Sequence, residues 1–285
     1  MAEHDLPQRS TPRSYWALSV LPHLVLFGAL MALWEGLSII NVIDSIMVPR
    51  PSEIVSAIWR LYVTERIIYP HFVVTFTEAV TGFAIGATIA VVLAVASSLS
   101  DVFQRYVSPY AIVLNVTPGI ALTPIIIAWF GYGMGSKIAL AAVICFFPIY
   151  VNALTGLLQT DEDREDLFRS LGGTKVQVFF KLRVPSSLPM VFAGMKIGLT
   201  TALIGAVVAE FAQATEGVGV LMGRFSFQLQ MAASIATLLS MTAIGLLLFY
   251  AMEFLDNRIV FWGRENRMAR VSRARAKAWQ RIMHK

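Results

Sequence analysis

The chain has 285 residues, of which 56% are hydrophobic and only 14% are charged, and its mean hydropathy is +0.66. This composition excludes an ordinary water-soluble domain and indicates a protein whose solvent is the lipid bilayer. The net charge of +5 does not favour nucleic-acid binding, because nine of the 23 Lys and Arg residues lie from Arg258 to the end, directly after a hydrophobic segment, where they suit anionic lipid headgroups.

Six stretches are apolar and long enough to cross the hydrocarbon core, which takes about 20 residues of helix. We therefore expect an all-α, polytopic membrane protein with six transmembrane helices. The first stretch lacks a small-residue cleavage site and is expected to be a retained span. The expected spans are 15–40, 72–99, 106–130, 138–159, 190–212 and 232–255.

A more polar helix is expected between the first two spans. Ser52 and Glu53 follow a proline-rich loop and can begin a helix that runs through Tyr69. Its apolar and aromatic residues favour a position in the membrane interface, and a solvent-exposed connector is the alternative.

Small residues and prolines mark features inside the spans. Two glycine pairs, Gly82 with Gly86 and Gly194 with Gly198, have the spacing that permits close helix approach. The glycine-rich stretch 131–137 lacks the spacing of a phosphate-binding loop, so we expect a turn between spans. The single cysteine, Cys145, lies in an apolar run and is expected to be a buried structural thiol.

The distribution of basic residues predicts the orientation of the chain. If both termini are cytoplasmic, 17 of the 23 Lys and Arg residues fall on the cytoplasmic side, five fall outside and Lys196 lies within a span. Because positively charged loops stay inside, this asymmetry places the long loop at about 160–189 in the cytoplasm.

This loop has the pattern of two short helices. The first begins with carboxylates near its N-terminal dipole and should end at Gly172 or Gly173, and the second should be capped by Thr174 and stop ahead of Pro185. On the first helix, an apolar patch is formed by Leu167, Phe168 and Leu171. The patch either enters a groove of a partner or folds back on the ends of the spans.

The run from Asp166 to Gly172, followed by the second helix and by the run from Val184 to Pro189, resembles the EAA loop of binding-protein-dependent ABC importer permeases. Asp166 stands in the place of the Glu and Gly172 holds the place of the glycine, while Leu188-Pro189 or Val184-Pro185 supplies the ending. Two larger residues, Leu167 and Phe168, replace the alanines of the family pattern. This departure requires a groove that accepts two bulkier side chains.

Three further elements resemble the nitrate, sulfonate and taurine branch of that family. They are the Val48-Pro49-Arg50-Pro51-Ser52 run after the first span, the proline-rich third span from Pro118 to Trp129-Phe130-Gly131, which includes Pro124, and Ala209-Glu210 followed by Gly217-Val218-Gly219. The order of these elements along the chain matches the order in the branch.

The resemblance implies a permease subunit without its own ATP-binding motif. It implies a homodimer of permeases that lines one pathway in the bacterial inner membrane, ABC ATPase subunits that use ATP and Mg, and a periplasmic or lipid-anchored substrate-binding protein. The chain would divide into a cytoplasmic segment at 1–14, a permease domain at 15–257 and a basic tail at 258–285. The residues expected to dock the ATPase are Asp166, Leu167, Phe168, Arg169, Ser170, Leu171 and Gly172.

The third and fifth spans are the expected pathway. Proline can kink or break the third span and free backbone carbonyls, which lipid does not tolerate but a wet cavity does. The candidate pathway residues are Asn115, Thr117, Pro118, Thr123, Pro124 and Glu210. Glu210 could cap a loop, form an outer gate or contact the binding protein. Among the other ionisable residues in the spans, Lys196 is expected to extend to the cytoplasmic headgroups, and Glu35, Glu78 and Glu253 are expected to be interfacial or interhelical partners.

The cargo implied by the resemblance is a small anionic solute of the nitrate, sulfonate or taurine type. The alternatives are a thiamin pyrimidine precursor or another small organic molecule in the same importer class, and an ATP-independent secondary transporter, which usually shows paired halves that this sequence lacks. An intramembrane enzyme is not favoured because the four histidines are scattered and no metalloprotease or nucleophile-elbow pattern occurs.

Overall fold

The computed structural model describes residues 14–40, 42, 44–45, 47–213 and 215–263. Within these ranges every regular element is a helix, and the all-α prediction is confirmed. The predicted N-terminal segment, except Ser14, and the basic tail beyond residue 263 lie outside the described residues. The α-helices are α1 (Ser14–Ile39), α2 (Pro51–Trp59), α3 (Ile68–Leu99), α4 (Asp101–Val116), α5 (Gly119–Phe130), α6 (Met134–Leu158), α7 (Glu162–Ser170), α8 (Lys175–Val178), α9 (Val184–Gln213), α10 (Val218–Phe227) and α11 (Met231–Ile259).

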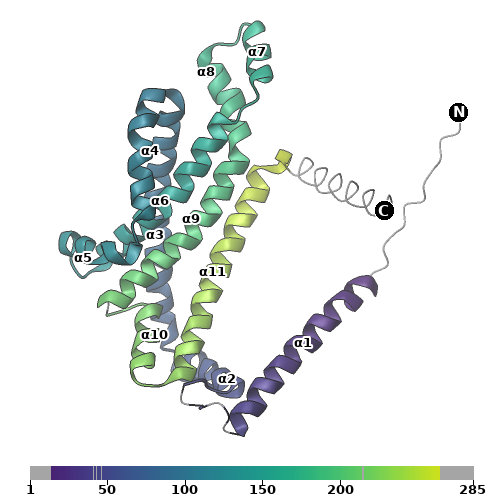
Figure 1. Ribbon diagram of the computed structural model, residues 1–285, viewed down its shortest axis with the longest axis vertical. Helices are drawn as coiled ribbons and strands as arrows, with labels where there is room; N and C mark the ends of the chain where they lie inside the picture. Colours follow the sequence, from purple (N-terminus) through teal and green to yellow (C-terminus); the bar gives the residue numbers. More distant parts are fainter. Residues whose placement is uncertain (1–13, 41, 43, 46, 214, 264–285) are drawn as a thin grey trace, which may run out of the picture. The chain divides into compact units, whose positions relative to one another are not determined.

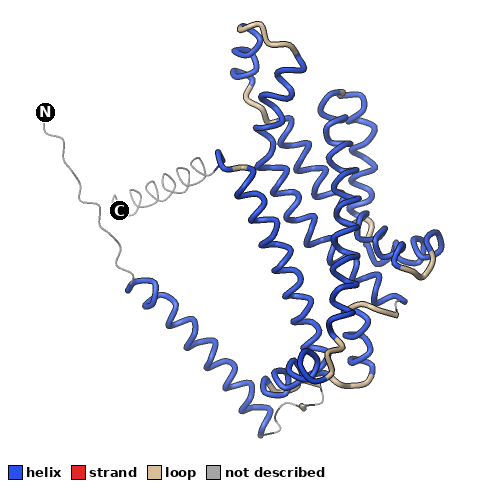
Figure 2. Tube along the Cα trace, turned by 180° about the vertical axis from the view of Figure 1, so that it is seen from behind, coloured by secondary structure: helices blue, strands red, loops and turns tan. Residues whose placement is uncertain are grey.

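Five helical segments in the described part of the chain are long and apolar enough to cross a membrane, and α4 with α5 form a sixth if the bent pair counts as one span. The prediction of six spans therefore holds if the bent pair is counted as the third span. The third span is broken into two helices that meet at 104° (Figure 1). The helical segments and the short loops between them are visible from behind in Figure 2.

The described residues divide into two compact units, the first drawn from the stretches 14–66 and 224–236 and the second from the stretches 67–223 and 237–263. In the first unit, Glu35 on α1 accepts hydrogen bonds from the backbone N–H and the hydroxyl of Ser52, at 3.1 and 2.7 Å. Glu35 therefore satisfies donors at the N-terminus of α2, where no partner is available within the helix.

The polar helix after α1 is shorter than predicted. Helix α2 continues into a π-helical turn at Arg60–Thr64 and ends near Arg66, which has a φ of 55°. A residue in the left-handed region cannot continue a right-handed helix, so the prediction of a helix through Tyr69 is wrong. Tyr69 instead lies in the first turn of α3.

The core of the second unit consists of α3, α6 and α9, which pack closely against one another. A Cβ atom on Gly82 would lie 2.5 Å from Cβ of Ala141, and one on Gly86 would lie 2.5 Å from the backbone oxygen of Ala142. A Cβ atom on Gly194 would lie 2.7 Å from Cβ of Asn152. The predicted close approach at both glycine pairs is confirmed, and Cys145 is buried in the same core.

The second short helix of the loop does not stop ahead of Pro185, as predicted, but runs into the fifth span. Thr174 caps it as expected: its hydroxyl accepts a hydrogen bond from the backbone N–H of Gln177, and the side-chain oxygen of Gln177 accepts one from the backbone N–H of Thr174. A π-helical turn at Phe179–Arg183 then joins α8 to α9 without a break. Because proline cannot donate a backbone hydrogen bond, we attribute the continuity to this wider turn, in which the N–H of Val184 bonds to the carbonyl of Phe179.

Candidate functional site

Helix α7 has well-formed ends, as the sequence predicted. Asp161 caps its N-terminus, where its side chain accepts a hydrogen bond from the backbone N–H of Asp163 at 3.2 Å. At the other end Gly172 has a φ of 83° and donates to the carbonyl of Arg169, while Gly173 donates to the carbonyl of Phe168. These two bonds form a Schellman motif, which fixes the direction in which the chain leaves the helix.

The apolar patch on α7 is divided between two faces. Leu167 and Leu171 are 60% and 79% exposed, whereas Phe168 is half-buried beside Gly173. The other residues predicted to dock a partner are exposed, namely Asp166, Arg169, Ser170 and Gly172. The patch does not fold back on the spans as a whole, because its two leucines remain open.

A bidentate ion pair fixes α7 to the beginning of the fifth span. Arg183 donates from Nε to Oε1 of Glu165 at 2.5 Å and from Nη2 to Oε2 at 3.0 Å, and Arg169 lies 3.6 Å from the same carboxylate. The hydrogen bonds from Arg183 hold the pKa of Glu165 below its ordinary value of 4.5, against the opposite effect of burial. Sequence reasoning missed the role of Glu165. The sequence shows only one acid among several on this helix, 18 positions before Arg183.

The candidate pathway residues Asn115, Thr117, Pro118, Thr123 and Pro124 lie on either side of the break between α4 and α5. Thr117 ends α4, with its N–H and its hydroxyl both bonded to the carbonyl of Val113, and Pro118 precedes the first residue of α5. Pro118 is therefore the proline at the break, whereas Pro124 lies inside α5 without ending it. Asn115 is exposed and Thr123 is buried.

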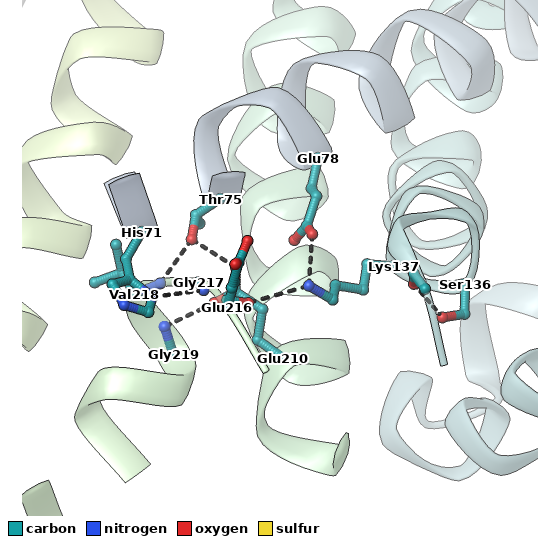
Figure 3. A network of polar contacts seen from close by, with 11 residues as sticks. His71, Thr75, Glu78, Ser136, Lys137, Glu210, Glu216, Gly217, Val218 and Gly219 are labelled. Carbon is teal, nitrogen blue, oxygen red and sulfur yellow. Dashed lines mark hydrogen bonds and ion pairs between the residues drawn. The ribbon is translucent and has the colours of Figure 1, made fainter. Parts of the chain in front are cut away.

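Glu210 belongs to a different group of residues (Figure 3), near the C-terminal end of α9, which is remote from α7 (Figure 1). It is 1% exposed and accepts hydrogen bonds from the hydroxyl of Thr75 at 2.5 Å and from the backbone N–H of Gly219 at 2.7 Å. Thr75 in turn accepts from the N–H of Val218 at 2.8 Å, and Nδ1 of His71 accepts from the N–H of Gly217 at 2.9 Å. Of the three roles considered for Glu210, the geometry supports capping of the loop between α9 and α10.

The close approach of Glu210 explains two glycines of the sequence motif. A Cβ atom on Gly219 would lie 2.7 Å from Oε2 of Glu210, and one on Gly217 would overlap the same carboxylate. Gly217 also has a φ of 128°, which side chains rarely adopt. The Gly-Val-Gly run therefore lets the backbone pass over the carboxylate.

Lys137 was expected in the turn between spans at 131–137, but the turn covers only residues 131–133 and Lys137 is helical. It lies in the first turn of α6, is 7% exposed, and donates to Oε1 of Glu78 at 2.7 Å and to the carbonyl of Glu216 at 3.1 Å. A buried ammonium requires such partners, because it has lost its water. Glu78 is thereby confirmed as an interhelical partner.

Lys196 on α9 bonds to Glu253 and Asp256 on α11, the latter at 2.6 Å. Its side chain is only 13% exposed, so pairing with two acids replaces the expected extension to the headgroups. Glu253 is an interhelical partner, as expected. Farther along the same two helices lies an apolar groove of about 620 Å³, lined by residues such as Leu203, Phe211 and Leu246.

Comparisons with known proteins agree with this architecture. The family model described as "Binding-protein-dependent transport system inner membrane component" matches residues 82–261. The formylaminopyrimidine transport permease protein ThiX of Halalkalibacterium halodurans is 34% identical over 88% of this chain and 98% of that protein. The putative aliphatic sulfonates transport permease protein SsuC of Bacillus subtilis is 28% identical over 84% of this chain and 86% of that protein. A solved structure of the MetNI methionine ABC transporter in an inward-facing conformation shares the fold, with a TM-score of 0.57 and 19% identity over 70% of this chain and 97% of that chain.

Proposed function

The chain belongs to the family of binding-protein-dependent transport system inner membrane components and is a membrane permease subunit of an ABC importer, and on this premise we propose that α7 is the element through which a partner ATPase drives it. The observation that carries the proposal is the pair of exposed leucines, Leu167 and Leu171, on a short helix that an ion pair fixes to the fifth span. Exposed apolar side chains on a rigid helix suit a hydrophobic groove of a partner protein.

The mechanism follows from what a docked helix can do. Closure of the ATPase subunits on ATP and Mg shifts the permease between its two conformations only if docking differs in free energy between them. The Glu165–Arg183 pair and the continuous helix from α8 into α9 transmit a displacement of α7 to the fifth span. This chain contributes no ATP-binding motif to that cycle.

The translocation pathway is proposed to follow the break between α4 and α5. The break leaves backbone carbonyls without helical partners, and these carbonyls are tolerated at membrane depth beside protein or a wet cavity. Asn115 and Thr117 would offer amide and hydroxyl groups to a passing solute, whereas Thr123 is buried and would support α5. We do not assign Glu210 to the pathway, because its hydrogen bonds hold the loop before α10.

The assembly is proposed to contain two copies of this permease, two ATPase subunits and a periplasmic or lipid-anchored binding protein that delivers the solute. Both termini and α7 would face the cytoplasm, and anionic lipids would contact the basic tail. The distribution of basic residues supports this orientation, since it places most of them on the α7 side.

The solute is proposed to be a small anion of the sulfonate type, as the name of the B. subtilis relative suggests. A pyrimidine precursor is the second candidate, which is supported by the 34% identity to the formylaminopyrimidine permease. In both cases the binding protein would select the solute.

The proposal is tested by reconstituting the permease in proteoliposomes with its partner ATPase and its binding protein. We expect uptake only when ATP and all three components are present, and the ligand of the binding protein identifies the solute. Uptake at the same rate without the ATPase would refute the role of α7 and would favour a secondary transporter. The Leu171→Asp variant should retain its place in the membrane and lose ATP-dependent uptake.

A further inference from the structure

Three ionisable side chains meet in the core formed by α3, α6 and α9, remote from α7. Glu78 on α3 is fully buried, Glu210 on α9 is 1% exposed and Lys137 on α6 is 7% exposed. They contribute two carboxyl groups and one ammonium group to one buried cluster (Figure 3). Each buried charge of this kind must be compensated by a partner.

The hydrogen bonds of the cluster leave one oxygen without a donor. Both oxygens of Glu210 accept, one from Thr75 and one from Gly219, and Oε1 of Glu78 accepts from Lys137. Oε2 of Glu78 is buried and has no hydrogen-bond partner among the described residues. It is directed toward the carboxyl group of Glu210, with which Glu78 interacts directly (Figure 3).

Full ionisation would leave this arrangement with two problems. The cluster would carry one uncompensated negative charge, and two carboxylate groups would face each other without a donor between them. The other titratable groups nearby do not remove the excess charge, because His71 accepts a hydrogen bond through Nδ1 and the side chain of Glu216 is exposed. Two carboxylates that share a buried site cannot both remain ionised.

We propose that Glu78 and Glu210 bind one proton between them, so that the cluster with Lys137 is electrically neutral and the orphaned oxygen of Glu78 takes part in a hydrogen bond. The proton belongs to the pair, and the geometry assigns it to neither residue alone. The bound ligand is thus a proton, in a site built from three helices.

The proton is linked to the loop before α10 through Glu210. The same carboxyl group that shares the proton accepts from Gly219 and from Thr75, which holds Val218. Loss of the proton leaves a net negative charge under this loop and weakens its attachment to α3. The stabilisation is therefore present while the proton is bound and is lost as the pH rises through the titration of the pair.

Two isosteric variants distinguish this proposal from an ordinary ion pair. In Glu78→Gln the amide oxygen can accept from Lys137 while the amide N–H donates to Glu210, so the variant reproduces the protonated pair. In Glu210→Gln one donor, either Thr75 or Gly219, must face an amide N–H. We expect Glu78→Gln to keep the Tm of the parent protein, and Glu210→Gln to lower the Tm by about 5 °C, as the loss of one buried hydrogen bond would.

The experiment measures thermal unfolding of the full chain in nanodiscs from about pH 6 to pH 9, together with infrared spectra that detect the C=O stretch of a protonated carboxyl group. We expect the Tm of the parent protein to fall at high pH, a pH-independent Tm in Glu78→Gln, and loss of one protonated-carboxyl band in that variant. If Glu210→Gln does not fold, the Glu78→Gln arm decides the question alone. A destabilised Glu78→Gln protein, or a carboxyl band that survives the substitution, overturns the proposal.

Discussion

The Glu165→Gln substitution gives the sharpest test of how α7 is attached to the fifth span. It keeps the length and the helix propensity of the side chain but removes the charge that two nitrogens of Arg183 contact at 2.5 and 3.0 Å. The side chain of Glu165 is 11% exposed and that of Arg183 is 28% exposed, so water screens the pair only in part. Hydrogen bonds to charged groups contribute about 1.5–3 kcal/mol, and we expect a loss of roughly 2 kcal/mol.

A loss of this size corresponds to a roughly 30-fold larger population of detached α7. Hydrogen exchange on the permease in nanodiscs should therefore show roughly 30-fold faster exchange at the amides of α7, with little change in the core helices. The ratio of solute transported to ATP hydrolysed should fall in the reconstituted importer, because a loosely held α7 transmits less of its displacement.

The matched control is Arg164→Gln. Arg164 lies on the same helix and pairs with Asp161 at 3.3 Å, but both side chains are more than half exposed, and such pairs contribute little. Exchange at the amides of α7 should be at most slightly faster in the Glu165→Gln/Arg183→Gln double variant than in either single variant. Each single substitution already removes the same ion pair. Equal exchange rates in the parent and Glu165→Gln proteins would refute the role assigned to this pair.

Three further predictions concern pH, packing and docking. Because Arg183 lowers the pKa of Glu165, the stabilisation from this pair is complete above the ordinary carboxyl value of 4.5 and is lost only as the pH falls through the lower folded value. Hydrogen exchange of α7 should thus be insensitive to pH between about 6 and 8 once the intrinsic rates are corrected, and a strong dependence there would contradict the assignment. Thermal unfolding should show that Gly86→Ala lowers the free energy of unfolding by about 1–3 kcal/mol, because the new Cβ would lie 2.5 Å from the backbone oxygen of Ala142. The control Gly245→Ala should not be destabilised, because the nearest atom to its Cβ, on the side chain of Leu203, is 3.4 Å away. Leu171→Asp should weaken association with the ATPase by roughly tenfold or more in a binding assay, and unchanged affinity would exclude the exposed leucine from the interface.

Much of the fold follows from local rules that the sequence displays directly. Apolar length predicted the spans, and spacing predicted the close approach at Gly82 and Gly86. The cap at Thr174 and the helix end at Gly172 were also predictable, because each depends on residues within a few positions. These features need no knowledge of what lies across the core.

The differences arise where a distant residue or an unusual helical turn determines the outcome. Lys137 looked like a loop residue because its partner, Glu78, lies 59 positions away in the sequence. Glu165 looked like one acid among several until Arg183 was found beside it. Pro185 looked like a helix stop, but the π-helical turn before it allows α8 to continue into α9.

The third span is another place where contacts with distant parts of the chain decide the structure. Pro118 was recognised as a site where the helix could kink or break, but proline alone does not set the angle between the two segments. The packing of α5 against α6 and α9 accompanies the 104° bend. Of the candidate residues, the five around this break are near one another in sequence, whereas the placement of Glu210 required the contacts of α3 and of the loop before α10.

The most direct test of the central claim is the location of α7 relative to the membrane and the ATPase. Leu171→Cys introduces an accessible thiol, because Leu171 is 79% exposed and the native Cys145 is fully buried. Tyr132→Cys is the matched control, since Tyr132 is 66% exposed and precedes α6, whereas Leu171 follows it. In sealed right-side-out vesicles an impermeant maleimide should label the cysteine at 132 and not the one at 171, and the latter should cross-link to the ATPase in the assembled importer. Labelling of position 171 from outside, without any cross-link to the ATPase, would contradict the account.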